Sequence, residues 1–232
     1  MPLPDNPICV ALDERDPERL RSLADAVMDH CGMLKVGLTA YARNGPEIVR
    51  ELARVRPVFL DLKLHDIPAQ VEGATGVVSE LGAEWVTVHA SGGGEMIKAA
   101  VAGAGPGLGV LAVTVLTSLD DVSLDAIGMR GPSLEAVLRL GEMALVSGAD
   151  GLVCSPLEVG AVRERFGTRA AGGPALFVPG IRLAESDAGD QRRTLGPGDA
   201  LDAGADVLVI GRPITAAADP GAAASAIAQG RR

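Results

Sequence analysis

Short apolar runs recur at regular intervals along the chain and alternate with stretches of helical periodicity. The runs are continuous and rich in β-branched residues, which is typical of parallel strands that are covered on both faces. We therefore expect strands at residues 8–12, 34–36, 58–64, 85–89, 108–116, 151–154, 175–178 and 207–210.

Between these runs, apolar residues recur at intervals of three and four, as on the buried face of a helix. The helical sets are Leu20, Leu23 and Val27 behind Pro17; Ile48, Leu52 and Val55; Val71, Ala74, Val78 and Leu81; Leu134, Val137, Leu138 and Leu145; and Leu157, Val162 and Phe166. Gly-Ala-acid triplets at 82–84, 148–150 and 204–206 precede strands and predict helix ends.

One β/α unit per roughly 25 to 30 residues favours a (β/α)8 TIM barrel that occupies residues 1–232 as a single domain. An open, doubly wound sheet is the alternative, because periodicity does not count strands reliably. In a barrel, polar residues at the carboxyl ends of the strands form the active site.

Composition narrows the possible partners. The chain contains 47% hydrophobic and 22% charged residues, so it is expected to be globular. A net charge of -9 and only 2% aromatic residues argue against a nucleic-acid surface. We expect no signal peptide and no membrane span. The three cysteines fit neither a disulfide framework nor a zinc site, and we interpret them as reduced, buried thiols of a cytoplasmic protein.

The strand expected at 58–64 becomes charged at its carboxyl end, where Asp61, Lys63 and Asp66 follow one another. Residues two apart in a regular strand lie roughly 6.6 Å apart along it, so the side chains of Asp61 and Lys63 should point to the same face. Lys35 lies on the neighbouring strand, and each lysine would be kept charged by nearby acids. Such a cluster suits proton transfer; a purely structural set of ion pairs is the alternative.

A phosphate site is expected at the other side of the barrel mouth. Gly211 and Arg212 follow the last strand, and Arg182 and Gln191 belong to the long polar segment 180–198. Glycine turns and arginines after strands 7 and 8 bind phosphate in many barrels, and a segment of this length is often a lid. A surface arginine beside a plain loop is the alternative. His65, His89 and Asp66 are a weak metal signal, and we expect no metal.

Several motifs together resemble the orotidine 5′-phosphate decarboxylase family and extend over nearly the whole chain. They are Val-Ala-Leu-Asp at 10–13, Lys-Val-Gly at 35–37, Asp-Leu-Lys-Leu-His-Asp-Ile-Pro at 61–68, Val-Leu-Thr-Ser at 115–118, Pro-Gly-Ile-Arg at 179–182, Gly-Asp-Gln at 189–191 and Ile-Gly-Arg-Pro-Ile-Thr at 210–215. The resemblance implies decarboxylation of orotidine 5′-phosphate to UMP and carbon dioxide, without a metal or an organic cofactor.

The resemblance also implies catalytic roles. Lys63 would protonate C6 of the pyrimidine, and Asp61 would lie against the departing carboxylate. Lys35 would bind a ribose hydroxyl and orient Asp61, and Asp13 would also bind the ribose. Asp66 would complete the catalytic set.

The remaining implied contacts divide between two subunits. Asp66 and Ile67 would reach into the site of a partner, which implies a homodimer with shared active sites. Further contacts to the base and the phosphate would come from Thr117, Ser118, Arg182, Gln191, Gly211 and Arg212, with the segment around Gln191 closing as a lid.

This sequence departs from the family pattern at two positions. Gln70 stands where the family usually has a threonine that touches the neighbouring ribose, and Leu183 replaces a frequent proline. Gln70 is long enough to make a hydrogen bond there. The rival interpretations are a related Mg²⁺-dependent sugar-phosphate enzyme, such as a 3-keto-gulonate phosphate decarboxylase or a hexulose phosphate synthase, and a non-catalytic nucleotide-binding barrel.

Overall fold

The computed structural model describes residues 1–182 and 195–230. Within these residues the strands are β1 (Ile8–Ala11), β2 (Met33–Gly37), β3 (Val58–Leu64), β4 (Trp85–His89), β5 (Gly109–Val113), β6 (Gly151–Val153), β7 (Ala175–Pro179) and β8 (Val207–Ile210). The helices are α1 (Pro17–Val27), α2 (Leu38–Asn44), α3 (Glu47–Ala53), α4 (Pro68–Ser79), α5 (Gly94–Gly103), α6 (Asp121–Ala126), α7 (Ser133–Val146), α8 (Val159–Phe166), α9 (Pro197–Asp202), α10 (Arg212–Thr215) and α11 (Pro220–Gln229).

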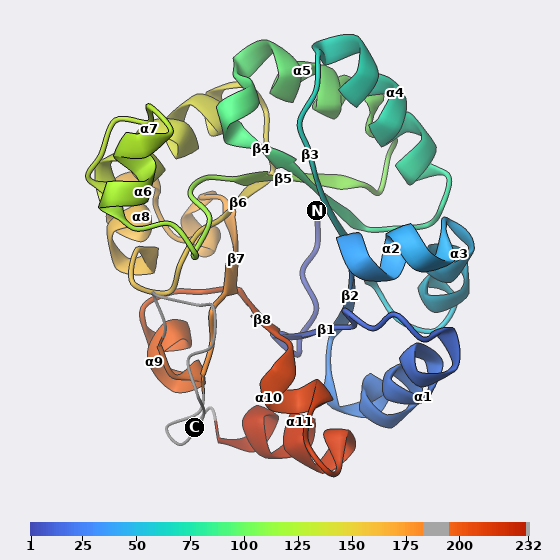
Figure 1. Ribbon diagram of the computed structural model, residues 1–232. Helices are drawn as coiled ribbons and strands as arrows, with labels where there is room; N and C mark the ends of the chain where they lie inside the picture. Colours follow the sequence, from blue (N-terminus) through green and yellow to red (C-terminus); the bar gives the residue numbers. More distant parts are fainter. Residues whose placement is uncertain (183–194, 231–232) are drawn as a thin grey trace.

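The strands form a closed parallel barrel in sequence order, with helices around the outside (Figure 1). Each strand pairs with the next, and β1 pairs with β8 to close the ring. The predicted TIM barrel is therefore confirmed, and an open sheet, which would leave two edge strands, is wrong. Closure matters for function because it brings the carboxyl ends of all these strands to one mouth.

The barrel explains why the apolar runs are continuous. Along β1, Cys9 and Ala11 belong to a cluster inside the barrel, whereas Ile8 and Val10 pack in the larger cluster between the strands and the helices. Both faces of each strand are thus covered, and no polar alternation is needed. At positions 82, 148 and 204 the predicted helix ends are confirmed by glycines with φ of 81°, 96° and 109°.

Several predicted element boundaries were wrong. The strand expected to continue to residue 116 ends at Val113, because its neighbours stop there: His89 ends β4 and Val153 ends β6, and both pair with Val113. The backbone N–H of Thr114 still donates to Val153 O at 3.2 Å, but the strand ends before it, and Thr117 lies in a loop rather than at a strand end. Three helical sets also extended too far: α3 ends at Ala53, before Val55; α4 ends at Ser79, before Leu81; and α8 begins at Val159, after Leu157.

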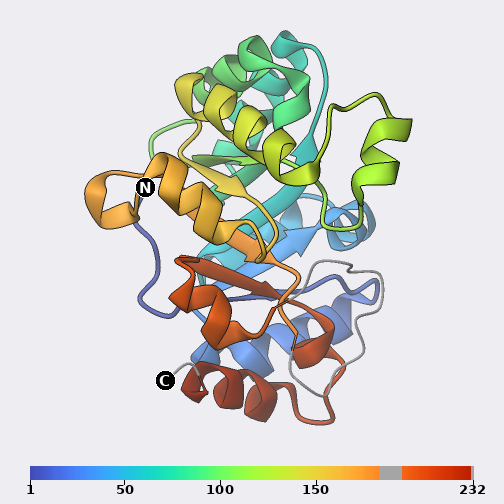
Figure 2. The same cartoon turned by 90° about the vertical axis from the view of Figure 1, so that its left-hand side faces the viewer.

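The two ends of the barrel differ. Met1 and Leu3 pack against the interior cluster, and Met1 O accepts a hydrogen bond from Arg169 Nη2 at 2.7 Å. The side view places this start of the chain at one end of the barrel and the yellow-green α6 at the other (Figure 2). The N-terminal end is thus closed by the chain itself. No helix in the described part is long and apolar enough to cross a membrane.

Candidate active site

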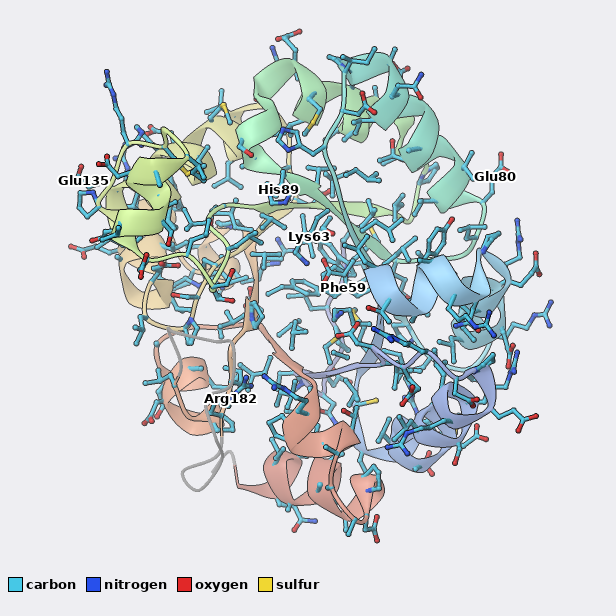
Figure 3. All side chains as sticks on the ribbon, in the orientation of Figure 1. Phe59, Lys63, Glu80, His89, Glu135 and Arg182 are labelled. Atoms are coloured by element: carbon cyan, nitrogen blue, oxygen red, sulfur yellow. The ribbon has the colours of Figure 1, made fainter. Side chains whose placement is uncertain are left out.

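A cavity of about 440 Å³ opens at the mouth formed by the carboxyl ends of the strands. Its walls contain nine of the residues predicted from the sequence, namely Asp13, Lys35, Asp61, Lys63, Thr117, Ser118, Arg182, Gly211 and Arg212. In Figure 3, Phe59 and Lys63 lie at the centre of the ring of strands, whereas Glu80 and Glu135 lie on its periphery. The fold therefore gathers polar side chains from distant parts of the sequence around one hollow.

A row of four charged groups of alternating sign lines one wall of this cavity. Lys35 Nζ lies 2.9 Å from Asp13 Oδ1 and 3.4 Å from Asp61 Oδ2. Asp61 Oδ1 in turn lies 2.7 Å from Lys63 Nζ. Lys35 and Asp61 are deep in the wall, with side-chain exposures of 8% and 12%, whereas Lys63 is 28% exposed. The row thus ends in an ammonium group that can reach a bound molecule.

The buried members of the row remain charged. Burial alone would raise the pKa of Asp61, but Lys35 and then Lys63 outweigh this effect, and the pKa is lowered. Burial likewise works to lower the pKa of Lys35, yet the carboxylates of Asp61 and Asp13 raise it. An ammonium between two carboxylates and a carboxylate between two ammonium groups therefore stabilise one another at neutral pH.

The backbone brings Asp61 and Lys63 together in a way that differs from the prediction. We expected a regular strand with both side chains on one face. Instead, the register of β3 against β4 shifts between Leu60 and Leu64, and Lys63 has a φ of 52°. Regular alternation is thus broken within this segment, and the short contact between Lys63 Nζ and Asp61 Oδ1 is made across a bulge.

Asp66, Ile67 and Gln70 do not line the cavity of their own chain. All three are exposed, and Ile67 has 64% of its surface accessible. Asp66 Oδ1 accepts a hydrogen bond from the backbone N–H of Ile67 at 2.7 Å. Their predicted contribution to the site of a second subunit stays a prediction.

Arg182, Gly211 and Arg212 occupy the part of the mouth at the ends of β7 and β8. The backbone N–H of Arg182 donates to Leu195 O at 3.0 Å, and its Nη1 donates to Ile181 O at the same distance. Gly211 immediately precedes the short helix α10, which begins at Arg212. Gln191, Leu183 and most of the predicted lid lie outside the described residues.

Comparison with known proteins shows the family of the chain. The family model described as "Orotidine 5'-phosphate decarboxylase / HUMPS family" matches residues 6–227. The chain belongs to this family. A family member from Anaeromyxobacter dehalogenans, named orotidine 5'-phosphate decarboxylase, is 55% identical over 98% of this chain and 99% of its own length. A protein of the same name from Thermobifida fusca is 52% identical over 96% of this chain and 94% of its own.

A solved structure of the same family has the same architecture. The crystal structure of orotidine 5'-phosphate decarboxylase from Lactobacillus acidophilus is 38% identical to this chain and has a TM-score of 0.84. It covers 98% of this chain and 100% of its own. The resemblance expected from the sequence motifs is thereby confirmed.

The sequence did not reveal two residues of this protein, Gly37 and Thr87, that support the charged row. A Cβ on Gly37 would overlap Asp13 Oδ1 and lie 2.7 Å from Lys35 Nζ, so any other residue here would force the ends of these two side chains to shift. Thr87, fully buried on β4, bonds to both Asp61 and the backbone of Lys63. The Lys-Val-Gly run contained a hint of the first, whereas a threonine within an apolar strand carries no signal.

The two histidines beside the site, His65 and His89, have rings tilted by 40° to one another. The ring centroids of His65 and His89 are 5.4 Å apart. Burial, followed by the charges of His65 and Lys63, lowers the pKa of His89, which therefore favours its neutral form. Among the described residues, no three His, Cys, Asp or Glu side chains are grouped closely enough to hold a metal ion.

Proposed function

We propose that this protein decarboxylates orotidine 5′-phosphate to UMP and carbon dioxide, a step of pyrimidine biosynthesis. The observation that carries the proposal is the alternating row Asp13, Lys35, Asp61 and Lys63 along a cavity that also contains Arg182 and Arg212. The row supplies a fixed proton donor, and the arginines supply charge for a phosphate. Relatives of this family that match almost the full length carry the name of the same activity.

The chemistry needs a cation beside C6 of the pyrimidine. When the bond between C6 and the carboxylate breaks, carbon dioxide leaves and the electron pair stays on C6 in the plane of the ring, where the π-system delocalises it poorly. The Lys63 ammonium stabilises this developing carbanion and then transfers a proton to C6. UMP is formed, and the neutral amine of Lys63 regains a proton from water.

The neighbours of Lys63 would prepare it for this step. Asp61 holds Lys63 Nζ at 2.7 Å and would lie against the substrate carboxylate. Lys35 would bind a ribose hydroxyl and orient Asp61, and Asp13 would bind the same sugar. Thr117 and Ser118, from the loop after β5, would contact the base.

The phosphate would bind far from the bond that breaks. Arg182, Gln191, Gly211 and Arg212 would hold it, through a two-pronged arginine contact and the backbone at the start of α10. Binding energy from such a remote group can position the ring and close the segment around Gln191 over it. Loss of these contacts should therefore slow the chemical step as well as weaken binding.

A homodimer would complete each site. Asp66 and Ile67 are exposed in the single chain and stand next to the Lys63 segment, so they are available to the site of a partner subunit. Gln70 lies two residues into α4 from Pro68 and would reach the neighbouring ribose. Asp61 and Lys63 would thus act in their own subunit, and Asp66 in the other.

The proposed reaction uses no metal, which separates it from the Mg²⁺-dependent sugar-phosphate enzymes that stabilise an enediolate. The direct test is an ultraviolet assay of orotidine 5′-phosphate conversion to UMP with and without excess EDTA. We expect turnover at the same rate in both. Loss of turnover with EDTA and its recovery with Mg²⁺ would favour the metal-dependent rival, and absence of turnover in both would favour a non-catalytic nucleotide-binding barrel.

Sharing of sites can be tested by mixing two inactive variants. Lys63→Ala removes the proton donor from its own site, and Asp66→Asn impairs only the partner's site. In a heterodimer, one of the two sites then retains both native residues. The activity of each heterodimer should therefore approach half the activity of a parent dimer. Confirmed heterodimers without any recovery would count against shared sites.

A further inference from the structure

Lys63 has an unusual backbone for a catalytic lysine on a strand. It is the one non-glycine residue in the described part of the chain with a positive φ, at 52°. The left-handed region costs a residue with a Cβ of the order of 1 kcal/mol or more, so the surroundings must hold it there. A contact with another segment of the barrel must therefore stabilise this conformation of Lys63.

The ladder between β3 and β4 shows where that partner lies. Leu60 pairs with Val86, and the next pairing is Leu64 with Val88. Residues 61–63 on β3 consequently stand opposite Thr87 alone. At this point β3 contains two residues more than a regular ladder would. Part of the backbone of residues 61–63 therefore cannot pair with the backbone of β4.

The hydroxyl of Thr87 takes over the missing pairing. The backbone N–H of Lys63 donates to Thr87 Oγ1 at 2.9 Å, and Thr87 Oγ1 donates to Asp61 Oδ1 at 3.0 Å. The same Asp61 Oδ1 also accepts from Lys63 Nζ at 2.7 Å. One fully buried hydroxyl thus joins the two ends of the Lys63 residue, its backbone and its ammonium, through a single carboxylate oxygen.

We propose that Thr87 is a positioning residue that sets the Lys63 ammonium for proton transfer. This inference rests on the proposed function, since it concerns how the proton donor is aimed. The hydroxyl is suited to the task because it accepts one hydrogen bond and donates another at the same atom. Serine retains that pattern, whereas valine has nearly the same shape and retains neither bond.

Without the hydroxyl, two groups lose their partner at once. The N–H of Lys63 has no acceptor opposite it in the ladder, and Asp61 loses one of the donors that fix its rotation. The peptide at Lys63 is then free to leave the left-handed region. A change of φ at this residue swings its side chain away from the mouth of the barrel, while the contacts of Asp61 with Lys35 remain.

The test compares Thr87→Val and Thr87→Ser with a matched control, Thr75→Val. Thr75 is equally buried, and its hydroxyl bonds to carbonyl oxygens within α4, away from the cavity. We expect Thr87→Val to lower kcat for orotidine 5′-phosphate at least thirtyfold with KM changed less than threefold, and Thr87→Ser to stay within about threefold of the parent. Thr75→Val should leave both constants within twofold.

Crystal structures of the Thr87 variants give a readout that does not depend on turnover. In Thr87→Val we expect Lys63 to leave its positive φ and its Nζ to move away from Asp61 Oδ1; Thr87→Ser should keep both. Retention of both features in Thr87→Val, or a kcat of that variant within threefold of Thr75→Val, overturns the proposal. If the parent protein fails to convert orotidine 5′-phosphate, the proposed function fails, and the crystal structures still decide the positioning role.

Discussion

Lys35 Nζ lies 3.4 Å from Asp61 Oδ2, while the other oxygen of the same carboxylate lies 2.7 Å from Lys63 Nζ. Asp61 is therefore shared by a buried lysine and a lysine that faces the cavity. Because both cations lower the pKa of Asp61, the carboxylate keeps its charge in a buried position. The charge of Asp61 thus depends on both lysines.

The shared carboxylate makes part of the stability of the protein dependent on pH. The pKa of Asp61 is lower in the folded than in the unfolded protein, so its contribution is present above the unfolded pKa and is lost as pH falls through the folded value. The free energy of unfolding of the parent and of Asp61→Asn can be measured by urea denaturation at pH 7 and at pH 3. The parent should lose more stability than the variant between pH 7 and pH 3. Asp25→Asn, on the exposed face of α1, is the control; an equal shift in that variant would contradict the assignment to Asp61.

Removal of the proton donor should abolish chemistry and spare the fold. Lys63→Ala is expected to lower kcat by about a thousandfold or more, because the electrostatic stabilisation of the carbanion and the proton source are lost together. Lys98→Ala removes an exposed lysine that pairs with Glu95 on α5, and serves as control. A kcat of Lys63→Ala within tenfold of the parent would refute the role of Lys63.

The phosphate contact should affect both kinetic constants. Arg212→Ala is expected to lower kcat/KM by about ten- to a hundredfold, the equivalent of one charge-assisted hydrogen bond, with kcat decreasing as well as KM rising. Arg165→Ala, which breaks an exposed pair with Glu142, should leave both constants unchanged. Unaltered kcat and KM in Arg212→Ala would rule out phosphate binding by this residue.

The glycine beside the ion pair should be required for recognition of the ribose. In Gly37→Ala the new Cβ displaces Asp13 from Lys35, since it would overlap the carboxylate. We expect kcat/KM for orotidine 5′-phosphate to decrease at least tenfold, and the preference over its 2′-deoxy analogue to shrink. The assay is steady-state kinetics with both substrates.

A matched glycine tests whether such an effect is local. Gly160 lies in α8, and an added Cβ there would point into open space, so Gly160→Ala should preserve the substrate preference and leave stability equal or slightly higher. If Gly37→Ala kept the parent preference between the two substrates, the ribose assignment of Asp13 and Lys35 would be wrong.

Local patterns along the chain were enough to predict the architecture and most of the site. Continuous apolar runs are typical of strands with both faces buried, and their spacing leaves room for a helix between successive strands. Charged residues at the ends of such runs, as at Asp61 and Arg212, then meet at the barrel mouth. These patterns, together with the motifs that resemble a known family, named nine of the residues that line the cavity.

The orientation of the side chains at the barrel mouth depends on contacts that form only in the folded barrel. The end of β5 at Val113 depends on where β4 and β6 stop, which no property of residues 108–116 reveals. The left-handed backbone of Lys63 depends on a hydroxyl from another strand, and the ion pair of Lys35 with Asp13 depends on the missing side chain of Gly37. Each involves segments that are separate in the sequence, so periodicity, which reports only local neighbours, carries no trace of it.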